Sequence, residues 1–249
     1  MNASGSADDL VARIGRDGFA LVPGVVGQRV VAQFASALDR APRTAATLER
    51  AGRVYAMRDL LGNIPEVRAL AASAAVRALV EPVLGMQAFV VRGLLFDKNP
   101  EANWVVPWHQ DLTIAVREKR DVPGFGPWTK KVGIPHVRPP VEVLEQMLTL
   151  RVHLDDCDAA SGPLRVLPGS HTMGILGDGA ARTWLARGPA VECLAERGDV
   201  LVMRPLLLHA SSTAERPRRR RVLHLEFAAG PLPGGIEWYE STENAKAAV

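Results

Sequence analysis

Residues 147–155 read MLTLRVHLD and alternate apolar and polar side chains along most of their length. Because successive side chains of a strand point to opposite faces, this period of two predicts a strand with one apolar and one polar face. The apolar face would carry Leu148, Leu150, Val152 and Leu154, and the polar face Thr149, Arg151 and His153. The polar face of such a strand is expected to line a polar interior.

A second stretch, 220–228, shows the same two-faced pattern. Leu223, Leu225 and Phe227 share one face, whereas Arg220, Val222, His224 and Glu226 share the other. Further strands are expected at 88–96 and 200–203. Several such strands predict a mainly β fold, a sandwich or barrel with flanking helices that back one sheet.

The first ninety residues predict helices around one short strand at 18–23, GFALVP. Helices are expected at 7–14 and 27–40, with two more between 66 and 84 that separate near Ser73. We interpret 1–249 as one domain with a helical region at about 7–85 and a β core at about 87–230. A tail at 231–249 is expected to fray from Glu240. The stretch 116–140 is rich in proline and glycine and predicts a functional loop or lid.

Composition narrows the function classes. The chain has 249 residues, of which 47% are hydrophobic, and a net charge of only +3. The basic cluster 216–221 contains no aromatic residues, so we expect no nucleic-acid partner. No run of 18 apolar residues occurs, so no membrane span is expected. The two cysteines, Cys157 and Cys193, match no zinc or disulfide spacing, which favours a reducing compartment and a cytoplasmic location.

The sharpest chemical feature is the tetrapeptide 108–111, WHQD. In an extended segment residues i and i+2 point the same way, so His109 and Asp111 can reach one point in space. They offer two ligands of the 2-His-1-carboxylate triad, which leaves coordination positions open on Fe(II). His209, after the apolar run 206–208, is the candidate third ligand. An isolated H-x-D pair is weak evidence, because such pairs are common at surfaces.

Arg220 makes the metal hypothesis specific. It lies eleven residues after His209, on the polar face of the last predicted strand. A buried guanidinium beside a metal site needs an anion, and its planar fork suits a carboxylate. Arg221 competes for this role, but strand parity puts it on the outward face with Leu223.

Taken together, these motifs resemble the phytanoyl-CoA dioxygenase family of Fe(II)- and 2-oxoglutarate-dependent oxygenases. The matching segments span about 16–230: GFALVP at 18–23, LFDK at 95–98, WHQD at 108–111, LDD at 154–156, GPLRVLPGSH at 162–171, and His209 with Arg220. The resemblance implies a double-stranded β-helix, a jelly-roll or cupin-like barrel. It also implies iron on His109, Asp111 and His209, and the distal carboxylate of 2-oxoglutarate on Arg220. Ser211 would be a hydroxyl partner, and Thr149 and Arg151 would be further co-substrate contacts.

The resemblance implies a dioxygenase that consumes 2-oxoglutarate and O₂, releases succinate and CO₂, and hydroxylates a C–H bond of a small molecule. Asp111 favours hydroxylation over halogenation, because related halogenases lack that carboxylate, and desaturation and ring closure stay open as other oxidative outcomes. Two alternatives stay open: a divalent-metal cupin-type hydrolase or isomerase, and a non-catalytic relative that keeps the barrel. Arg220 disfavours the first, and retention of all the ligands disfavours the second. The sequence does not reveal the substrate or the oligomeric state.

Other histidines and tryptophans are weaker candidates. His171 follows the turn sequence 168–170, so we expect it to structure a loop rather than bind metal. The other histidines are expected to be satisfied polar residues, two of which could line the cavity, and three tryptophans flank the site as a substrate wall or as packing. These residues are His136, and His153 and His224 at the cavity, with Trp104, Trp108 and Trp128.

Overall fold

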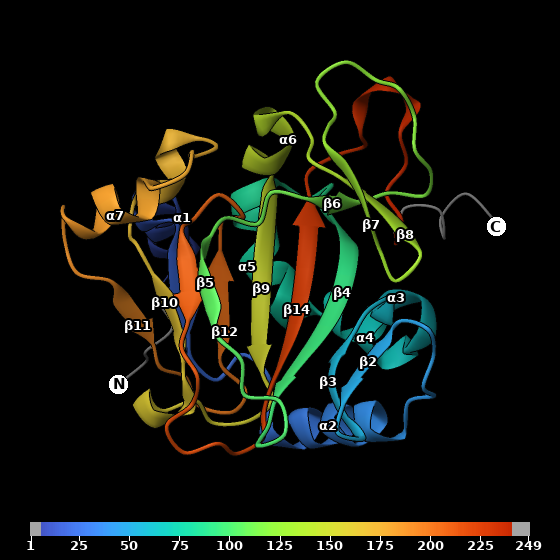
Figure 1. Cartoon of the computed structure of the whole chain (residues 1–249), viewed down its shortest axis with the longest axis vertical. Helices are drawn as coiled ribbons and strands as arrows, with labels where there is room; N and C mark the ends of the chain where they lie inside the picture. The colour runs from blue at the N-terminus through green and yellow to red at the C-terminus, as the bar shows by residue number, and fades with distance from the viewer. Residues whose placement is uncertain (1–5, 241–249) are drawn as a thin grey trace.

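A computed structural model describes residues 6–240, and its centre is a seven-stranded antiparallel sheet (Figure 1). The predicted alternating strands occupy its middle and gain hydrogen-bonded neighbours on both sides. In spatial order the strands are β1 (Phe19–Val22), β12 (Val200–Met203), β9 (Met147–His153), β14 (Arg220–Ala228), β4 (Phe89–Lys98), β3 (Arg53–Met57) and β2 (Thr47–Arg50).

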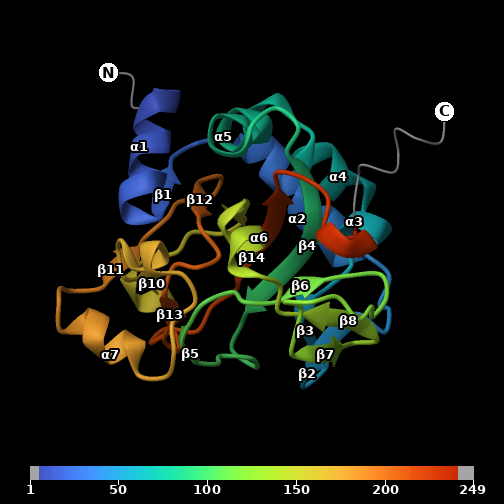
Figure 2. The ribbon, with the colours of Figure 1, turned by 90° about the horizontal axis from the view of Figure 1, so that it is seen from above.

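Helices cover one face of this sheet, as Figure 2 shows from above. They are α1 (Ala7–Asp17), α2 (Gln28–Arg40), α3 (Leu60–Asn63), α4 (Pro65–Ala71) and α5 (Ala74–Leu84). Their apolar sides form the main core together with Leu148, Leu150, Val152 and Leu154, which are each 0% exposed. The predicted apolar face of β9 therefore packs against helices, and the predicted break at Ser73 is the N-cap of α5.

A four-stranded sheet lies over the opposite face of the large sheet (Figures 1 and 2). Its order is β11 (Val191–Cys193), β10 (Leu164–Val166), β13 (His209–Ser211) and β5 (Val106–His109). The two sheets enclose a jelly-roll interior, and the predicted polar faces of β9 and β14 point into it. The predicted mainly β, double-stranded β-helix fold with flanking helices is confirmed.

A third, three-stranded sheet consists of β6 (Ile114–Ala115), β8 (Ile134–Val137) and β7 (Trp128–Lys131). The predicted loop at 116–140 is therefore partly wrong, because 128–137 forms a hairpin. The helical reading of 7–85 also missed a hairpin, β2–β3. Both hairpins turn through a non-glycine residue with positive φ followed by glycine: Ala51 (φ 47°) with Gly52 (φ 73°), and Val132 (φ 47°) with Gly133 (φ 87°).

Two further short helices lie outside the helical layer. They are α6 (Val141–Glu145), just before β9, and α7 (Ala180–Leu185), between β10 and β11; three 3₁₀ turns are η1 (Ala159–Ser161), η2 (Ser170–Met173) and η3 (Pro233–Gly235). The first helix runs to Asp17, beyond the predicted end near Gly15. It stops at Gly18, whose φ of 82° is the left-handed conformation that favours glycine.

The segment after β14 packs back onto the molecule. Leu232, Ile236 and Trp238 are buried in a cluster with β6 and β8 residues. Glu240 is 7% exposed and accepts hydrogen bonds from the backbone N–H groups of Leu61 and Gly93, at 2.7 and 3.0 Å. The expected fraying at Glu240 is therefore wrong for that residue, and 241–249 lie outside the described residues. Within 6–240, no helix has the length and apolarity needed to cross a membrane.

Candidate metal and co-substrate site

His109 and His209 are directly paired across two strands of the small sheet. His109 ends β5 and His209 begins β13, and the register places them opposite each other. Their ring centroids are 4.1 Å apart. Asp111 reaches the same point, with its Oδ1 3.7 Å from His109 Nε2 and its Oδ2 3.7 Å from His209 Nε2. One ligand atom from each residue lies within 4.8 Å of the other two.

The backbone fixes which ring nitrogen each histidine presents. Nδ1 of His109 donates to the carbonyl of Pro107, and Nδ1 of His209 donates to the carbonyl of Leu207, each at 2.8 Å. A neutral imidazole that donates through Nδ1 keeps a lone pair on Nε2. Burial lowers the pKa of His209 to about 4, so this ring is neutral at pH 7. Both Nε2 atoms are therefore oriented as metal ligands.

Asp111 supplies the negative charge. Burial raises its pKa, but the surrounding His209, His224, His109 and Arg151 outweigh that effect and hold the pKa at about 2. Its Oδ2 is buried and has no hydrogen-bond donor among the described residues. A buried, ionised oxygen without a donor requires a cation. Two imidazoles and one carboxylate on one side of a cavity fit a ferrous ion with open positions.

Gln110 faces away from the cluster, as the extended segment predicted. Its amide nitrogen donates to the carbonyls of Gly174 and Leu206, at 2.9 and 2.6 Å. Its amide oxygen accepts from the N–H of Leu176 at 2.8 Å. The Gln110 side chain thus anchors the short segment between the two ligands, which holds His109 and Asp111 on the opposite side.

Three buried cations gather beside the cluster. Arg220 Nη1 donates to the carbonyl of Gly162 at 2.8 Å, and Arg151 Nη1 donates to Nδ1 of His224 at 3.1 Å. The Nε atoms of Arg220 and Arg151 are buried and have no partner among the described residues. Lys98 Nζ donates to Ser211 Oγ at 3.3 Å. Burial and Arg220 lower the pKa of Lys98 to about 8 and that of Arg151 to about 10.

None of these three cations has a carboxylate within 4.0 Å among residues 6–240. Buried charges without a counter-ion are costly, so the cluster calls for an anion. Lys98 was not predicted to take part, because the expected strand ended at Phe96. If that strand is extended by two residues, Lys98 lies on the same interior face as Phe96. In the structure Lys98 is directly opposite Arg220.

The remaining predicted contacts are also interior. Ser211 is 4% exposed and lies against Lys98. Thr149 is 1% exposed, but β14 pairs it with Glu226 rather than with Arg220. The structure therefore brings Ser211 and Arg151 to the Arg220 region and leaves Thr149 farther along the strand. Arg221 points to the helices, where its guanidinium pairs with Asp155 at 2.8 Å, as strand parity predicted.

The other histidines lie outside the metal cluster. His171 is in η2, where a side chain on Gly18 would collide with its ring. His136 accepts from Arg92 at 3.0 Å, and His224 Nε2 donates to Glu226 at 3.3 Å. His153 is 3% exposed, and burial lowers its pKa to about 3. His136 and His224 are satisfied in the polar interior, as expected, whereas Nδ1 of His153 is buried and has no partner among the described residues.

The tryptophans have mixed surroundings. Trp104 meets Tyr55 edge-on at 5.6 Å, and Lys98 Nζ lies 5.6 Å from its ring centre. Trp108 lies 5.6 Å from the guanidinium of Arg165, and Trp128 packs against the core cluster of the third sheet. Only Trp104 therefore contacts one of the three cations of the site.

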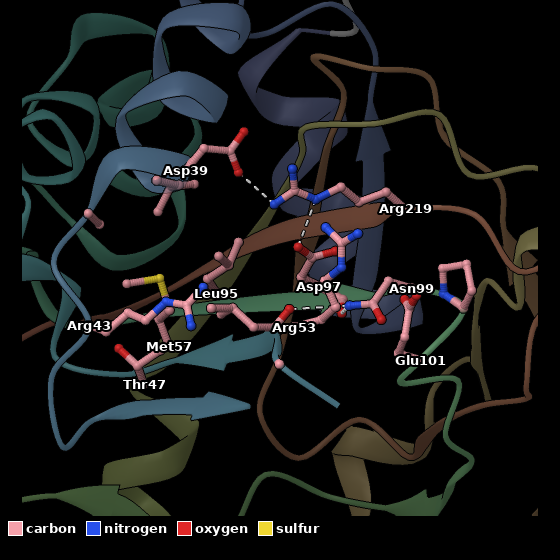
Figure 3. Close-up of a pocket in the computed structure, with 15 residues that line it drawn as sticks. Asp39, Arg43, Thr47, Arg53, Met57, Leu95, Asp97, Asn99, Glu101 and Arg219 are labelled. Atoms are coloured by element: carbon pink, nitrogen blue, oxygen red, sulfur yellow. Dashed lines mark hydrogen bonds and ion pairs between the residues drawn. The ribbon is translucent and has the colours of Figure 1, made fainter. Parts of the chain in front are cut away.

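A separate pocket of about 600 Å³ opens on the helix side of the large sheet (Figure 3). Arg219 spans it, with ion pairs to Asp39 at 2.6 Å and to Asp97 at 2.8 Å. Arg219, which belongs to the basic cluster 216–221, therefore makes structural ion pairs here. This pocket shares no lining residue with the metal cluster and lies on the other face of β4.

The phytanoyl-CoA dioxygenase family matches residues 14–222, which is most of the chain. No curated protein sequence matches it. AviO1 from Streptomyces viridochromogenes Tue57 has a similar structure, with a TM-score of 0.67 and 23% identity over 93% of this chain and 100% of that one.

Two further similar structures were solved with ligands. EctD from S. alaskensis with 2-oxoglutarate and 5-hydroxyectoine has a TM-score of 0.71 and 18% identity, over 92% of this chain and 78% of that one. The epimerase SnoN with Fe³⁺, alpha ketoglutarate and nogalamycin RO has a TM-score of 0.66 and 18% identity, over 92% of this chain and 91% of that one. These likenesses show the shared fold.

Proposed function

The chain belongs to the phytanoyl-CoA dioxygenase family of Fe(II)- and 2-oxoglutarate-dependent oxygenases, and we propose that it hydroxylates a C–H bond of a small molecule. We assign the iron to His109, Asp111 and His209. The observation that carries this assignment is the buried Asp111 oxygen without a donor, flanked by two Nε2 lone pairs. When bound there, iron would supply the oxidising chemistry that couples 2-oxoglutarate decarboxylation to substrate oxidation.

The chain's own residues would bind and orient the co-substrate. Arg220 and Lys98 face each other across β14 and β4 and would hold the distal carboxylate of 2-oxoglutarate. Gly162 fixes the Arg220 guanidinium by accepting one N–H, which leaves its other donors for the ligand. Ser211 would add a hydroxyl donor, and Arg151 would balance the second negative charge. Thr149 remains a weaker proposed contact.

The two alternative functions are less well supported. A cupin-type hydrolase or isomerase would use the metal ligands but would leave three buried cations without a role. A non-catalytic relative would have no reason to keep both the metal cluster and the cations. We also propose a cytoplasmic location, because Cys157 and Cys193 are both buried free thiols, as is usual in a reducing compartment.

The first test is an anaerobic titration with Fe(II) and 2-oxoglutarate, which should produce a visible charge-transfer band. Arg220→Gln should weaken 2-oxoglutarate binding by about 2–4 kcal/mol, or roughly 30- to 1000-fold, because it removes a charge-assisted bidentate contact. Arg221→Gln is the matched control, since its guanidinium pairs with Asp155 outside the interior. It should leave the affinity unchanged.

Asp111→Ala should abolish coupled succinate release. Unchanged succinate formation in Asp111→Ala would remove this residue from the ligand set. Equal losses in the Arg220 and Arg221 variants would show that neither guanidinium contacts the co-substrate directly.

A further inference from the structure

A second group of cations lies in the interior, away from Arg220. Arg92 and Glu226 face each other across β4 and β14, six residues along β4 from Lys98. At about 3.3 Å per residue the two ends are roughly 20 Å apart, which the five-carbon 2-oxoglutarate cannot span. Whatever these cations bind is therefore not the co-substrate held by Arg220.

Arg58 and Lys131 complete this second group from two other elements. Arg58 follows β3, two residues after Ala56, which pairs with the interior residue Phe96; it therefore shares the interior face. Lys131 ends β7, and its Nζ donates to Thr113 Oγ1 at 3.1 Å. Thr113 lies two residues after Asp111, so Lys131 contacts the segment that carries this metal ligand.

The charges in this region do not balance. Glu226 is already engaged, with Arg92 at 3.0 Å and His224 at 3.3 Å. Burial and Arg92 lower the pKa of His136 to about 4, so it adds no charge at pH 7. Among residues 6–240, no carboxylate lies within 4.0 Å of Arg58 or Lys131. Three cations therefore face one carboxylate, because the charge of Asp111 would be taken by the metal.

Both unpaired cations are partly removed from water. The Nε of Arg58 is buried and has no partner among the described residues. Burial, followed by the charges of Arg92 and Arg58, lowers the pKa of Lys131. Like charges held together in a half-buried site are unfavourable unless an anion joins them.

We propose that the primary substrate carries an anionic group, a carboxylate or a phosphate, which Arg58 and Lys131 bind on the side of the metal cluster opposite Arg220. This inference rests on the proposed function and adds the substrate's chemical class to it. The guanidinium of Arg58 would supply a planar pair of donors, and Lys131 a point charge from the other side. Arg58, just after β3, and Lys131, in β7, would hold the anionic end from two sides and leave the rest of the substrate beside the metal.

The test uses anaerobic enzyme saturated with Fe(II) and 2-oxoglutarate, so that the co-substrate site is filled. Calorimetry compares three six-carbon probes: hexanoate, hexyl phosphate and the uncharged hexanamide. We expect at least one of the anions to bind about tenfold or more tightly than hexanamide. Arg58→Gln and Lys131→Gln should each remove most of that preference and leave the 2-oxoglutarate affinity unchanged.

Lys130→Gln is the matched control, because Lys130 is the exposed neighbour of Lys131 on the opposite face of β7. It should keep the full preference. Hexanamide binding as tightly as the anions, no binding of any probe, or an equal loss in Lys130→Gln would overturn the proposal. The relative affinities of hexanoate and hexyl phosphate decide between a carboxylate and a phosphate. A missing charge-transfer band would instead reject the proposed function, so the two failures are distinguishable.

Discussion

Lys98 shows how one buried side chain can make co-substrate binding depend on pH. Burial and the nearby Arg220 lower its pKa to about 8. Its ammonium would attract the co-substrate only while protonated. We therefore expect 2-oxoglutarate affinity to be constant below about pH 7 and to fall as pH rises through 8, by up to about tenfold per pH unit for one proton. Titration of the charge-transfer band between pH 7 and 9.5 measures this.

Two variants separate Lys98 from other titrating groups. Lys98→Arg keeps a permanent charge and should flatten the pH profile, whereas Lys98→Met should bind weakly at every pH. A wild-type affinity that stays constant up to pH 9.5, together with undiminished binding in Lys98→Met, would rule out Lys98 as a co-substrate contact.

The site residues that could be predicted from the sequence are those whose relative orientation follows from local backbone geometry. His109 and Asp111 are two apart in an extended segment, and Arg220 has a strand parity that separates it from Arg221. Arg58 and Lys131 could not be found in this way. Their proximity depends on how β3 and β7 fold toward the metal cluster, which no local period encodes.

Among the elements, the 3₁₀ turn η1 and the strand after it position Arg220 through Gly162. Gly162 has φ 64°, and a Cβ there would lie 2.6 Å from the backbone oxygen of Ser212. Gly162→Ala should therefore shift this loop together with the carbonyl that Arg220 uses. We expect unfolding stability to drop by about 1–3 kcal/mol and 2-oxoglutarate affinity to fall as well.

Denaturant unfolding and the charge-transfer titration measure the two effects of Gly162→Ala. The control is Gly177→Ala, because a Cβ at Gly177 meets nothing within 4 Å. If the Gly162 variant bound 2-oxoglutarate normally despite lower stability, the carbonyl would have no part in orienting Arg220.

Strands β9 and β14 were predictable because apolar and polar side chains alternate over many residues, a pattern that excludes a helix. The hairpins β2–β3 and β7–β8 were not. Their strands have only four or five residues, and all except β8 carry charged side chains, so their hydrophobic alternation is weak. Their turns place Ala51 and Val132 where Asn or Asp would normally signal a hairpin.

At the scale of the whole molecule, the barrel interior has two cationic regions toward opposite ends of β4 and β14. One contains Lys98, Arg151 and Arg220, and the other contains Arg58, Arg92 and Lys131. The separation of the two regions follows from the register of β4 and β14. It places Lys98 opposite Arg220 at one end and Arg92 opposite Glu226 at the other. Co-substrate and substrate would therefore approach the metal from opposite ends.

Glu240 adds a polar attachment to the apolar packing of the C-terminal segment, because its carboxylate joins α3 to β4. Burial raises its pKa from 4.5 to about 7, even though two backbone N–H groups stabilise the ionised form. Between these values the folded chain binds more protons than the unfolded chain, so the free energy of unfolding falls as pH rises from about 4.5 to 7.

The Glu240→Gln variant tests this, because its side chain cannot ionise. The amide nitrogen of Gln cannot accept from Leu61 or Gly93, so the variant loses one hydrogen bond at every pH. In metal-free urea unfolding, the stability of the variant relative to the wild type should nevertheless rise by about 2–3 kcal/mol between pH 5 and pH 8. A difference that does not change with pH would show that Glu240 is already ionised at pH 5 in the folded protein.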